Sequence, residues 1–478
     1  MVELPDGWSV GIQYLMVKPT GEGGFRLHLL SQATREDRKM RVRIVAAVAL
    51  AVSLFAVAPS SARTEKSPAV PATIALAWNA NAVAAVRAAS VIDPQGTAAR
   101  PLYQTEGLLY MSYVQAAVYD AATKIGHRYA PYHRFSAAAG NASLQAAVIA
   151  AAYNTLVFYL GDPGGTLAAK YAASIAALPH DRTTARGIAV GQAAAADIEA
   201  LRANDGRNAP VSTPFGAGPL QPGLWVWAPP PSLQIAQTPW MAVMRPFMLH
   251  STSQFRAPAP PALTSALYTR DFNETKAYGS ATSAVRTPAQ TAIAYFWNAS
   301  AVSQVNQTLQ NVATQHNLDL LDTVRLLAAG NMVPTDAGMA CFDSKYTYQF
   351  WRPITAIRNA GIDGNPATTA DPTWTPLLTT PNHPEYPSQH GCVTSAVAQV
   401  LANALKTRSI NATIPGAQGG ATTLTTSQTF ATVQDLYTQL VNARVWIGFH
   451  YRNSVVAGEN LGTAVAKWEL QRYFLPTD

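Results

Sequence analysis

Apolar residues recur at helical spacing along two long stretches of this chain, and no strong alternating pattern typical of strands appears. The first stretch predicts helices over 71–92, 108–125, 142–160 and 185–201, with a further helix starting at Gly165. The second predicts helices over 263–278, 288–300, 318–329, 340–352, 393–405, 430–447 and 454–473. Alanine runs such as 193–196 favour helix and close helix packing. The sequence therefore predicts an all-α fold.

A segment rich in proline and tryptophan, 205–262, separates the two helical stretches. Its tryptophans, Trp225, Trp227 and Trp240, indicate an ordered wrap packed onto a core rather than a free linker. A chain of 478 residues exceeds one ordinary core. We expect two packed helical bundles, at 63–204 and 263–478, joined by this Pro-rich connection.

An export signal is predicted at 40–62. Basic residues after Met40 precede a short apolar stretch, 44–57, and a small-residue cleavage site follows it. Residues 1–39 are then a mis-called N-terminal extension, with Met40 as the true start. An uncleaved anchor is the alternative. The signal predicts a protein that is secreted or held in the periplasm or at the cell surface, with no stable membrane anchor after cleavage.

The charge pattern argues against a nucleic-acid partner. The formal net charge is +7, but charged residues make up only 13% of the chain, and the main body has no run of Lys and Arg. We therefore expect no nucleic-acid binding. A concave site lined with cations would instead attract small anions.

The first segment with chemical potential is Lys345-Tyr-Thr-Tyr-Gln-Phe-Trp-Arg352-Pro353. Lys345 and Arg352 are seven residues apart, so on one helix both side chains would leave the same face. Pro353 disfavours helix at the residue before it, which predicts that Arg352 lies near the helix end. The alternative is two solvated surface cations.

The second segment is His383-Pro-Glu-Tyr-Pro-Ser388-Gln389-His390-Gly391. Ser388 is the expected N-cap of the helix that follows, and the free N–H groups of a helix start bind anions. His390 would stand in the first turn, where an imidazole can act as general acid and base. A capping serine beside an incidental histidine is the alternative.

The third segment is Ala443-Arg444-Val-Trp-Ile-Gly448-Phe-His450. On a continuous helix Arg444 and His450 would diverge by about 120°. Gly448 offers a break that brings His450 round to Arg444. Together the three segments supply three cations, a hydroxyl, helix-start amides and two histidines. No zinc-type Cys/His spacing competes with them. This inventory predicts a site for a tetrahedral oxyanion.

These segments resemble the signature of the vanadium-dependent haloperoxidase and type 2 phosphatidic acid phosphatase superfamily. That signature runs Lys-x6-Arg-Pro, Pro-Ser-Gly-His and Ser-Arg-x5-His. Here it appears as Lys345…Arg352-Pro353, Pro387-Ser388-Gln389-His390 and Ala443-Arg444…His450. The surrounding residues look like the bacterial haloperoxidase-like branch, and the likeness is strongest over 263–478. It implies paired helical bundles.

The resemblance also implies a vanadate cofactor. His450 would be the ligand of the metal, and His390 the acid–base histidine. The residues implied to hold vanadate are Lys345, Arg352, Ser388, Gln389, Arg444 and His450, and those implied to be catalytic are Lys345, His390 and His450. Hydrogen peroxide would oxidise a halide to a hypohalous species, which attacks a small organic acceptor. A homo-oligomer is compatible with this picture.

Two positions depart from the family pattern, because Gln389 replaces its glycine and Ala443 its serine. Two others bear on the halide. His383 matches a histidine of the bromoperoxidase-like branch, and Phe342 stands where fungal chloroperoxidases have tryptophan. This mixture favours bromide or iodide, although packing alone explains both residues equally well. Asp271 or Glu274 is the expected partner of the second ring nitrogen of His390.

Two other functions stay open. The same residues suit a phosphatase acting on phosphate monoesters, with His450 forming a phosphohistidine and His390 protonating the leaving group. A helical protein that binds anions without catalysis is the third reading. The only cysteines, Cys341 and Cys392, flank two of the segments and would be either bridged or two buried thiols.

Overall fold

The computed structural model describes residues 16–20, 24–28, 70–92, 99–230, 234–416 and 427–477. The chain divides into two units, Met1–Pro68 and Ala69–Asp478. In the first unit, β1 (Met16–Thr20) and β2 (Gly24–His28) pair as an antiparallel hairpin. The predicted export signal, 40–62, lies outside the described residues.

The second unit is built from helices, which confirms the all-α prediction. They are α2 (Thr73–Ala88), α3 (Gln104–Gly126), α4 (Leu144–Leu160), α5 (Thr166–Ala176), α6 (Arg182–Arg202), α7 (Ala266–Gly279), α8 (Pro288–Phe296), α9 (Ala301–Gln315), α10 (Leu320–Tyr348), α11 (Pro353–Arg358), α12 (Gln389–Leu405), α13 (Val433–Trp446) and α14 (Arg452–Leu470). Two short antiparallel pairs accompany them, β3 (Ser90–Ile92) with β4 (Ala99–Pro101) and β5 (Ala412–Ile414) with β6 (Gln428–Phe430).

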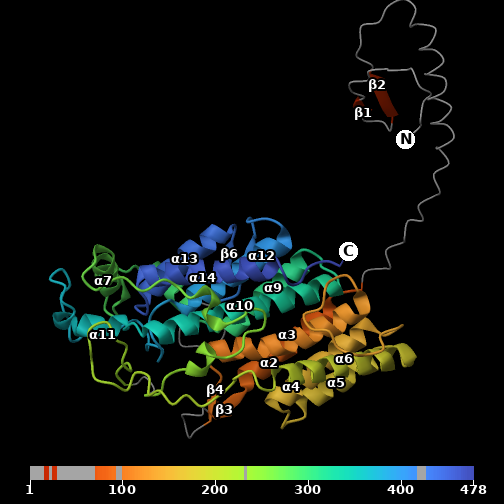
Figure 1. Cartoon of the computed structure of the whole chain (residues 1–478), viewed down its shortest axis with the longest axis horizontal. Coiled ribbons are helices and arrows are strands. Elements are labelled where there is room, and N and C mark those ends of the chain that lie inside the picture. The colour runs from red at the N-terminus through yellow and green to blue at the C-terminus, as the bar shows by residue number, and fades with distance from the viewer. Residues whose placement is uncertain are drawn as a thin grey trace, which may run out of the picture. The chain divides into compact units, whose positions relative to one another are not determined.

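Helix α10 forms the centre of this unit, with α3 on one side and α12 and α14 on the other (Figure 1). The sequence predicted two helices here, over 318–329 and 340–352, and this was wrong. A single helix of 29 residues runs through Pro334. Its glycines serve close packing instead of breaking the helix. A Cβ at Gly330 would lie 2.4 Å from the side chain of Leu309 on α9.

Helices α12 and α14 approach each other closely through glycines. A Cβ at Gly391 would lie 2.6 Å from the carbonyl oxygen of Val455, and one at Gly462 only 2.0 Å from that of Cys392. A side chain at either position would push the helices apart. This contact sets the start of α12 beside the start of α14, where two of the three sequence motifs lie.

The Pro- and Trp-rich segment packs against the helices. Trp225 and Trp240 are both 1% exposed, and short 3-10 turns form at Pro239–Ala242 and Thr252–Phe255. Residues of both helical stretches share one apolar core. The division at 204/205 and 262/263 stays a prediction.

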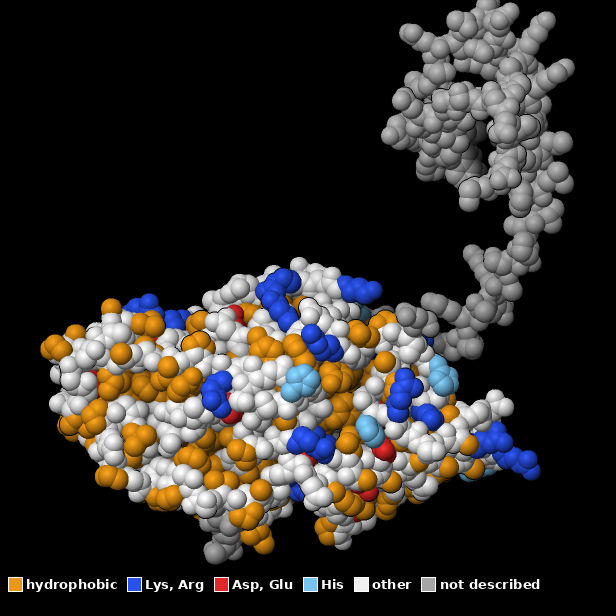
Figure 2. Space-filling view, in the orientation of Figure 1, with side chains coloured by type: hydrophobic (Ala, Val, Ile, Leu, Met, Phe, Trp, Pro, Cys, Tyr) orange, Lys and Arg blue, Asp and Glu red, His pale blue; other side chains and the backbone are white. Residues whose placement is uncertain are grey.

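The surface shows no large basic area on the face drawn in Figure 2, where lysines and arginines stand singly or in small groups among apolar side chains. Among the described residues, no helix combines the length and the apolar composition needed to cross a membrane.

Candidate active site

The first motif does not lie on one helix as predicted. Lys345 is in the last turn of α10, which ends at Tyr348, and Gln349 takes a left-handed conformation with φ 46°. Arg352 is instead the N-cap of α11, whose first residue is Pro353. Proline is favoured at the first helical position because its missing N–H is not needed there. The expected shared helix face is therefore wrong, and a turn brings the two cations together.

Both cations are fully buried and bind the same loop. The Lys345 ammonium donates to the carbonyl of Pro384 at 2.8 Å. The Arg352 guanidinium donates from Nε to the carbonyl of His383 at 2.8 Å and from Nη1 to that of Phe449 at 3.0 Å. These bonds fix the charged ends between the loop of the second motif and the end of the third.

The second motif forms the start of α12 as the sequence predicts. Ser388 is the N-cap residue, yet its buried hydroxyl has no hydrogen-bond partner among the described residues. The side chain of Gln389 is buried with both its amide oxygen and nitrogen unpaired within the same set. His390 is half-buried, and its Nε2 also lacks a partner there. Unpaired buried polar atoms are costly, so these three side chains are suited to binding a polar ligand.

The third motif breaks at glycine, as predicted. Arg444 lies in the last turn of α13, Gly448 takes a φ of +80°, and His450 follows just before α14 begins at Arg452. A φ in this region favours glycine over any other residue. The Arg444 guanidinium is buried, donates to the carbonyl of Trp297 at 3.2 Å, and has an unpaired Nε among the described residues.

The contacts of His450 decide which ring nitrogen carries its proton. Nη1 of Arg352 lies 3.3 Å from Nε2 of His450, and arginine can only donate. Nε2 therefore holds the lone pair, and Nδ1–H donates to the carboxylate of Glu385 at 2.9 Å. The backbone N–H of Tyr451 donates to the same oxygen at 3.1 Å. His450 thus presents an imidazole nitrogen that can bind an electrophilic centre.

Glu385 is the functional residue that the sequence interpretation missed. It is fully buried directly behind His450, although the second motif gave it no role. The available signal was a lone acid among prolines and aromatics in His383-Pro-Glu-Tyr-Pro, where a solvated glutamate is out of place.

Burial perturbs every charged group of the site. It lowers the pKa of Lys345 to about 8, of Arg352 to about 10 and of Arg444 to about 9, and nearby Arg352 further lowers the pKa of the other two. Burial raises the pKa of Glu385 to about 7. Lys345 and Arg352 thus act on one carboxyl group, that of Glu385, and Arg444 adds a third buried cation. This excess of positive charge calls for an anion.

The two site histidines are held neutral. Burial, followed by the charges of nearby arginines and of Lys345, lowers the pKa of His390 and of His450 well below the ordinary range. The described residues contain no cluster of three or more His, Cys, Asp or Glu suited to a metal cation. Cationic donors, the free hydroxyl of Ser388 and the N–H groups of a helix start fit a tetrahedral oxyanion such as vanadate or phosphate.

The prediction that Asp271 or Glu274 is the partner of His390 was wrong. Asp271 accepts from the backbone N–H of Asn453 at 2.7 Å. Glu274 forms an ion pair with Arg452 at 2.6 Å. Both acids on α7 therefore hold the start of α14, and the structure does not bring either to His390.

The two residues proposed to influence halide choice lie beside the site. The rings of Phe342 and His383 are 5.6 Å apart, and Nδ1 of His383 is 3.0 Å from Nη2 of Arg352. The sequence left open whether the two cysteines form a disulfide or remain thiols. Cys341 and Cys392 are free, buried thiols.

Comparisons with known proteins agree with this geometry. Residues 325–475 match the family model described as the VCPO second helical-bundle domain. The vanadium chloroperoxidase of Curvularia inaequalis is 28% identical over 142 residues, which cover 24% of this chain. The match spans only 23% of that relative's length.

Two solved structures share the fold over most of the chain. A bacterial vanadium-dependent iodoperoxidase has a TM-score of 0.68 at 19% identity, covering 86% of this chain and 99% of its own. A holo-type bacterial vanadium-dependent chloroperoxidase has a TM-score of 0.65 at 19% identity, covering 85% and 99%. The resemblance seen in the three motifs is therefore confirmed for the fold: the chain has the fold of the vanadium haloperoxidases, and residues 325–475, which contain all three motifs, match their second helical-bundle domain.

Proposed function

We propose that this chain is a vanadate-dependent haloperoxidase that oxidises halide with hydrogen peroxide. The observation that supports this most is the buried set of three cations, Lys345, Arg352 and Arg444, whose charges act together on both His390 and His450. Burying three cations close together is costly to the folded protein, and a multiply charged oxyanion compensates that cost. Export would place the oxidising product outside the cell.

Each site residue has one task in this proposal. Lys345, Arg352 and Arg444 neutralise the oxyanion, and Ser388 donates to it. Glu385 holds Nδ1–H of His450, so that Nε2 keeps the lone pair with which it would bind the oxyanion in place of its contact with Arg352. Bound vanadate would supply Lewis-acid activation of peroxide without changing oxidation state.

His390 supplies proton transfer. Its neutral Nε2 is unpaired among the described residues and stands in the first turn of α12, two residues after Ser388. It can take a proton from incoming peroxide and return it to the departing oxygen.

The halide is proposed to be bromide or iodide. His383 contacts Arg352 and packs against Phe342, so a polar ring stands directly beside one of the site cations. We expect larger, more easily oxidised halides to react at this site, and chloride to react poorly.

A phosphatase is the second candidate, and the His450–Glu385 pair favours it. A neutral imidazole whose Nδ1–H is held by a carboxylate is a competent nucleophile toward phosphate esters. The cations would then stabilise charge that develops during transfer.

One pair of assays separates the candidates. The purified protein is loaded with orthovanadate and given peroxide with bromide, iodide or chloride, and halogenation of an acceptor is followed. Hydrolysis of p-nitrophenyl phosphate is measured without vanadate. Vanadate-dependent turnover of bromide and iodide supports the proposal, whereas ester hydrolysis without any halide oxidation overturns it.

Matched histidine variants test the residue roles. His450→Ala and His390→Ala should each lose activity, since one removes the vanadate ligand and the other the proton carrier. His180→Ala, on an exposed position after α5, is the control and should keep full activity. Full activity in His450→Ala would show the site assignment to be wrong.

A further inference from the structure

An apolar pocket opens directly beside His390. It lies between α3, α9, α12 and α13. Its walls are mainly aliphatic, from Leu108, Val305, Val393, Val397, Leu401 and Leu436. A mainly aliphatic lining with a few polar side chains is typical of sites for small organic molecules.

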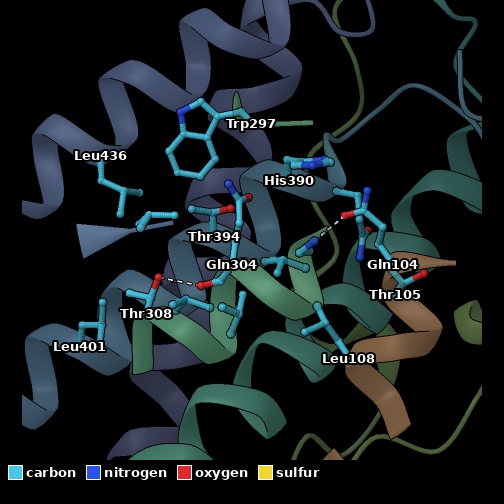
Figure 3. A pocket seen from close by; sticks show the side chains of 16 residues that line it. Gln104, Thr105, Leu108, Trp297, Gln304, Thr308, His390, Thr394, Leu401 and Leu436 are labelled. Atoms are coloured by element: carbon cyan, nitrogen blue, oxygen red, sulfur yellow. Dashed lines mark hydrogen bonds between the residues drawn. The ribbon is translucent and has the colours of Figure 1, made fainter. Parts of the chain in front are cut away.

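Figure 3 shows His390, Gln104 and Thr105 on one side of the pocket, and Leu401 and Leu436 on the other. Thr308 lies near Leu401, but its hydroxyl already donates to the carbonyl of Gln304. The hydroxyl of Thr105 and the Nε2 of His390 are buried atoms without a partner among the described residues. An organic molecule with one polar group would satisfy them while its apolar part fills the remaining space.

The pocket also reaches the oxyanion site. Lys345, Arg352, Ser388, Arg444 and His450 are each 2% exposed or less. His390 is half-buried, and it lines the pocket. Of these six site residues, His390 is the most exposed, and a molecule in the pocket therefore lies directly next to it.

Gln389 makes this end of the pocket particular to this chain. It stands where the family pattern has glycine, it lines the pocket, and both its amide atoms are unpaired among the described residues. Space for it comes from Gly338 on α10, where a Cβ would lie 2.8 Å from Nε2 of Gln389. The amide offers one acceptor and two donors to a bound molecule.

We propose that this pocket binds the organic acceptor of the reaction, a flat, electron-rich aromatic compound such as a phenol, with its hydroxyl group at Gln389 and His390. The inference rests on the proposed haloperoxidase function for its chemistry. The side chain of Trp297 in the wall offers an aromatic surface for stacking. Bound here, the acceptor meets the oxidised halogen before that species escapes.

The halogenation step balances with one molecule of hypohalous acid. A ring carbon attacks the halogen, the carbon–halogen bond forms, and the halogen–oxygen bond breaks to leave hydroxide. The ring carbon then loses its proton, which joins the hydroxide as water. The Nε2 of His390 is placed to carry that proton.

Binding is tested first without vanadate, by calorimetry with p-cresol and the full-length protein. Ala301→Phe places a ring at the rim of the pocket and should weaken binding by about tenfold or more. Gln389→Gly should weaken it too, by removing the polar anchor. Ala169→Phe, an exposed position on α5, is the matched control and should bind as the wild type does.

Activity supplies the second readout. Ala301→Phe should lose bromination of p-cresol but keep triiodide formation from iodide, which needs no organic acceptor. Failure of p-cresol to bind the wild type, or equal binding by Ala301→Phe, would overturn the inference. Equal affinity for 4-methylcyclohexanol would overturn its aromatic specificity. Binding of p-cresol without any vanadate-dependent halide oxidation would refute the proposed function while supporting the binding site.

Discussion

Substituting Gly462 with alanine should separate α12 from α14 and disturb the site at a distance. A Cβ there would lie 2.0 Å from the carbonyl oxygen of Cys392 and 2.3 Å from Oγ of Ser395. Carbon atoms in proteins essentially never come closer than 3.0 Å in such contacts, so the helices must part by at least 3.0 − 2.0 = 1.0 Å.

Two effects of opposite sign compete in this variant. Alanine favours a helix over glycine by about 1 kcal/mol. Overpacking of a filled interior costs about 1–3 kcal/mol, and a backbone atom cannot move aside as a side chain can. The difference is about 0–2 kcal/mol, and because the contact is with a backbone atom we expect the upper end, a loss of about 2 kcal/mol in the free energy of unfolding. Cys392 is two residues beyond His390, and a shift of about 1 Å at a reacting group costs on the order of a hundredfold in rate.

The measurements are urea unfolding followed by circular dichroism, and halide oxidation by the vanadate-loaded protein. Gly140→Ala is the control, because a Cβ at this exposed turn meets no atom within 4 Å. Wild-type stability and activity in Gly462→Ala would refute the claim that the α12–α14 contact positions the site.

Three further predictions concern buried charges. Glu385→Gln should weaken orthovanadate binding by tenfold to a hundredfold, as measured by calorimetry, since His450 loses the carboxylate that orients it; unchanged affinity would contradict this role. Arg444→Met removes a buried cation that has no carboxylate partner among the described residues. Without oxyanion, the free energy of unfolding of this variant should therefore be about 1–4 kcal/mol higher than that of the wild type, and orthovanadate should no longer stabilise it. A lower stability in urea would contradict this prediction. Burial, followed by the charge of Asp336, raises the pKa of Glu469 well above 4.5, so the folded state binds more protons than the unfolded state. Its contribution to stability is therefore present below pH 4.5 and lost at up to about 1.4 kcal/mol per pH unit as pH rises toward the raised pKa; Glu469→Gln should flatten the fall in stability above pH 4.5, and identical slopes would refute it.

The sequence could predict the helical class and the break at Gly448 because both depend on local rules. Apolar spacing gives helices directly, and a glycine between two site residues marks a turn. Local rules were ambiguous for Pro353, which disfavours helix at the residue before it and equally favours a new helix after it. Only the tertiary structure decides between these, and it places Arg352 at a new helix start.

Other features depend on neighbours far along the chain. The sequence does not show that Gly330 serves a close contact, because that contact is with Leu309 on another helix, α9. Glutamate is seldom buried, so Glu385 gave no strong signal until its contact with His450 was known. Asp271 and Glu274 on α7 were wrongly predicted to contact His390, because sequence alone does not show that Glu274 pairs with the distant Arg452.

The contacts of His450 also constrain the order of folding. Its imidazole meets Arg352, 98 residues earlier, and Glu385, 65 residues earlier. Such non-local contacts carry the largest loop-closure entropy and form late. A partly folded chain therefore has no oxyanion site, and an anion that binds only the native state should slow unfolding while leaving the rate of folding unchanged.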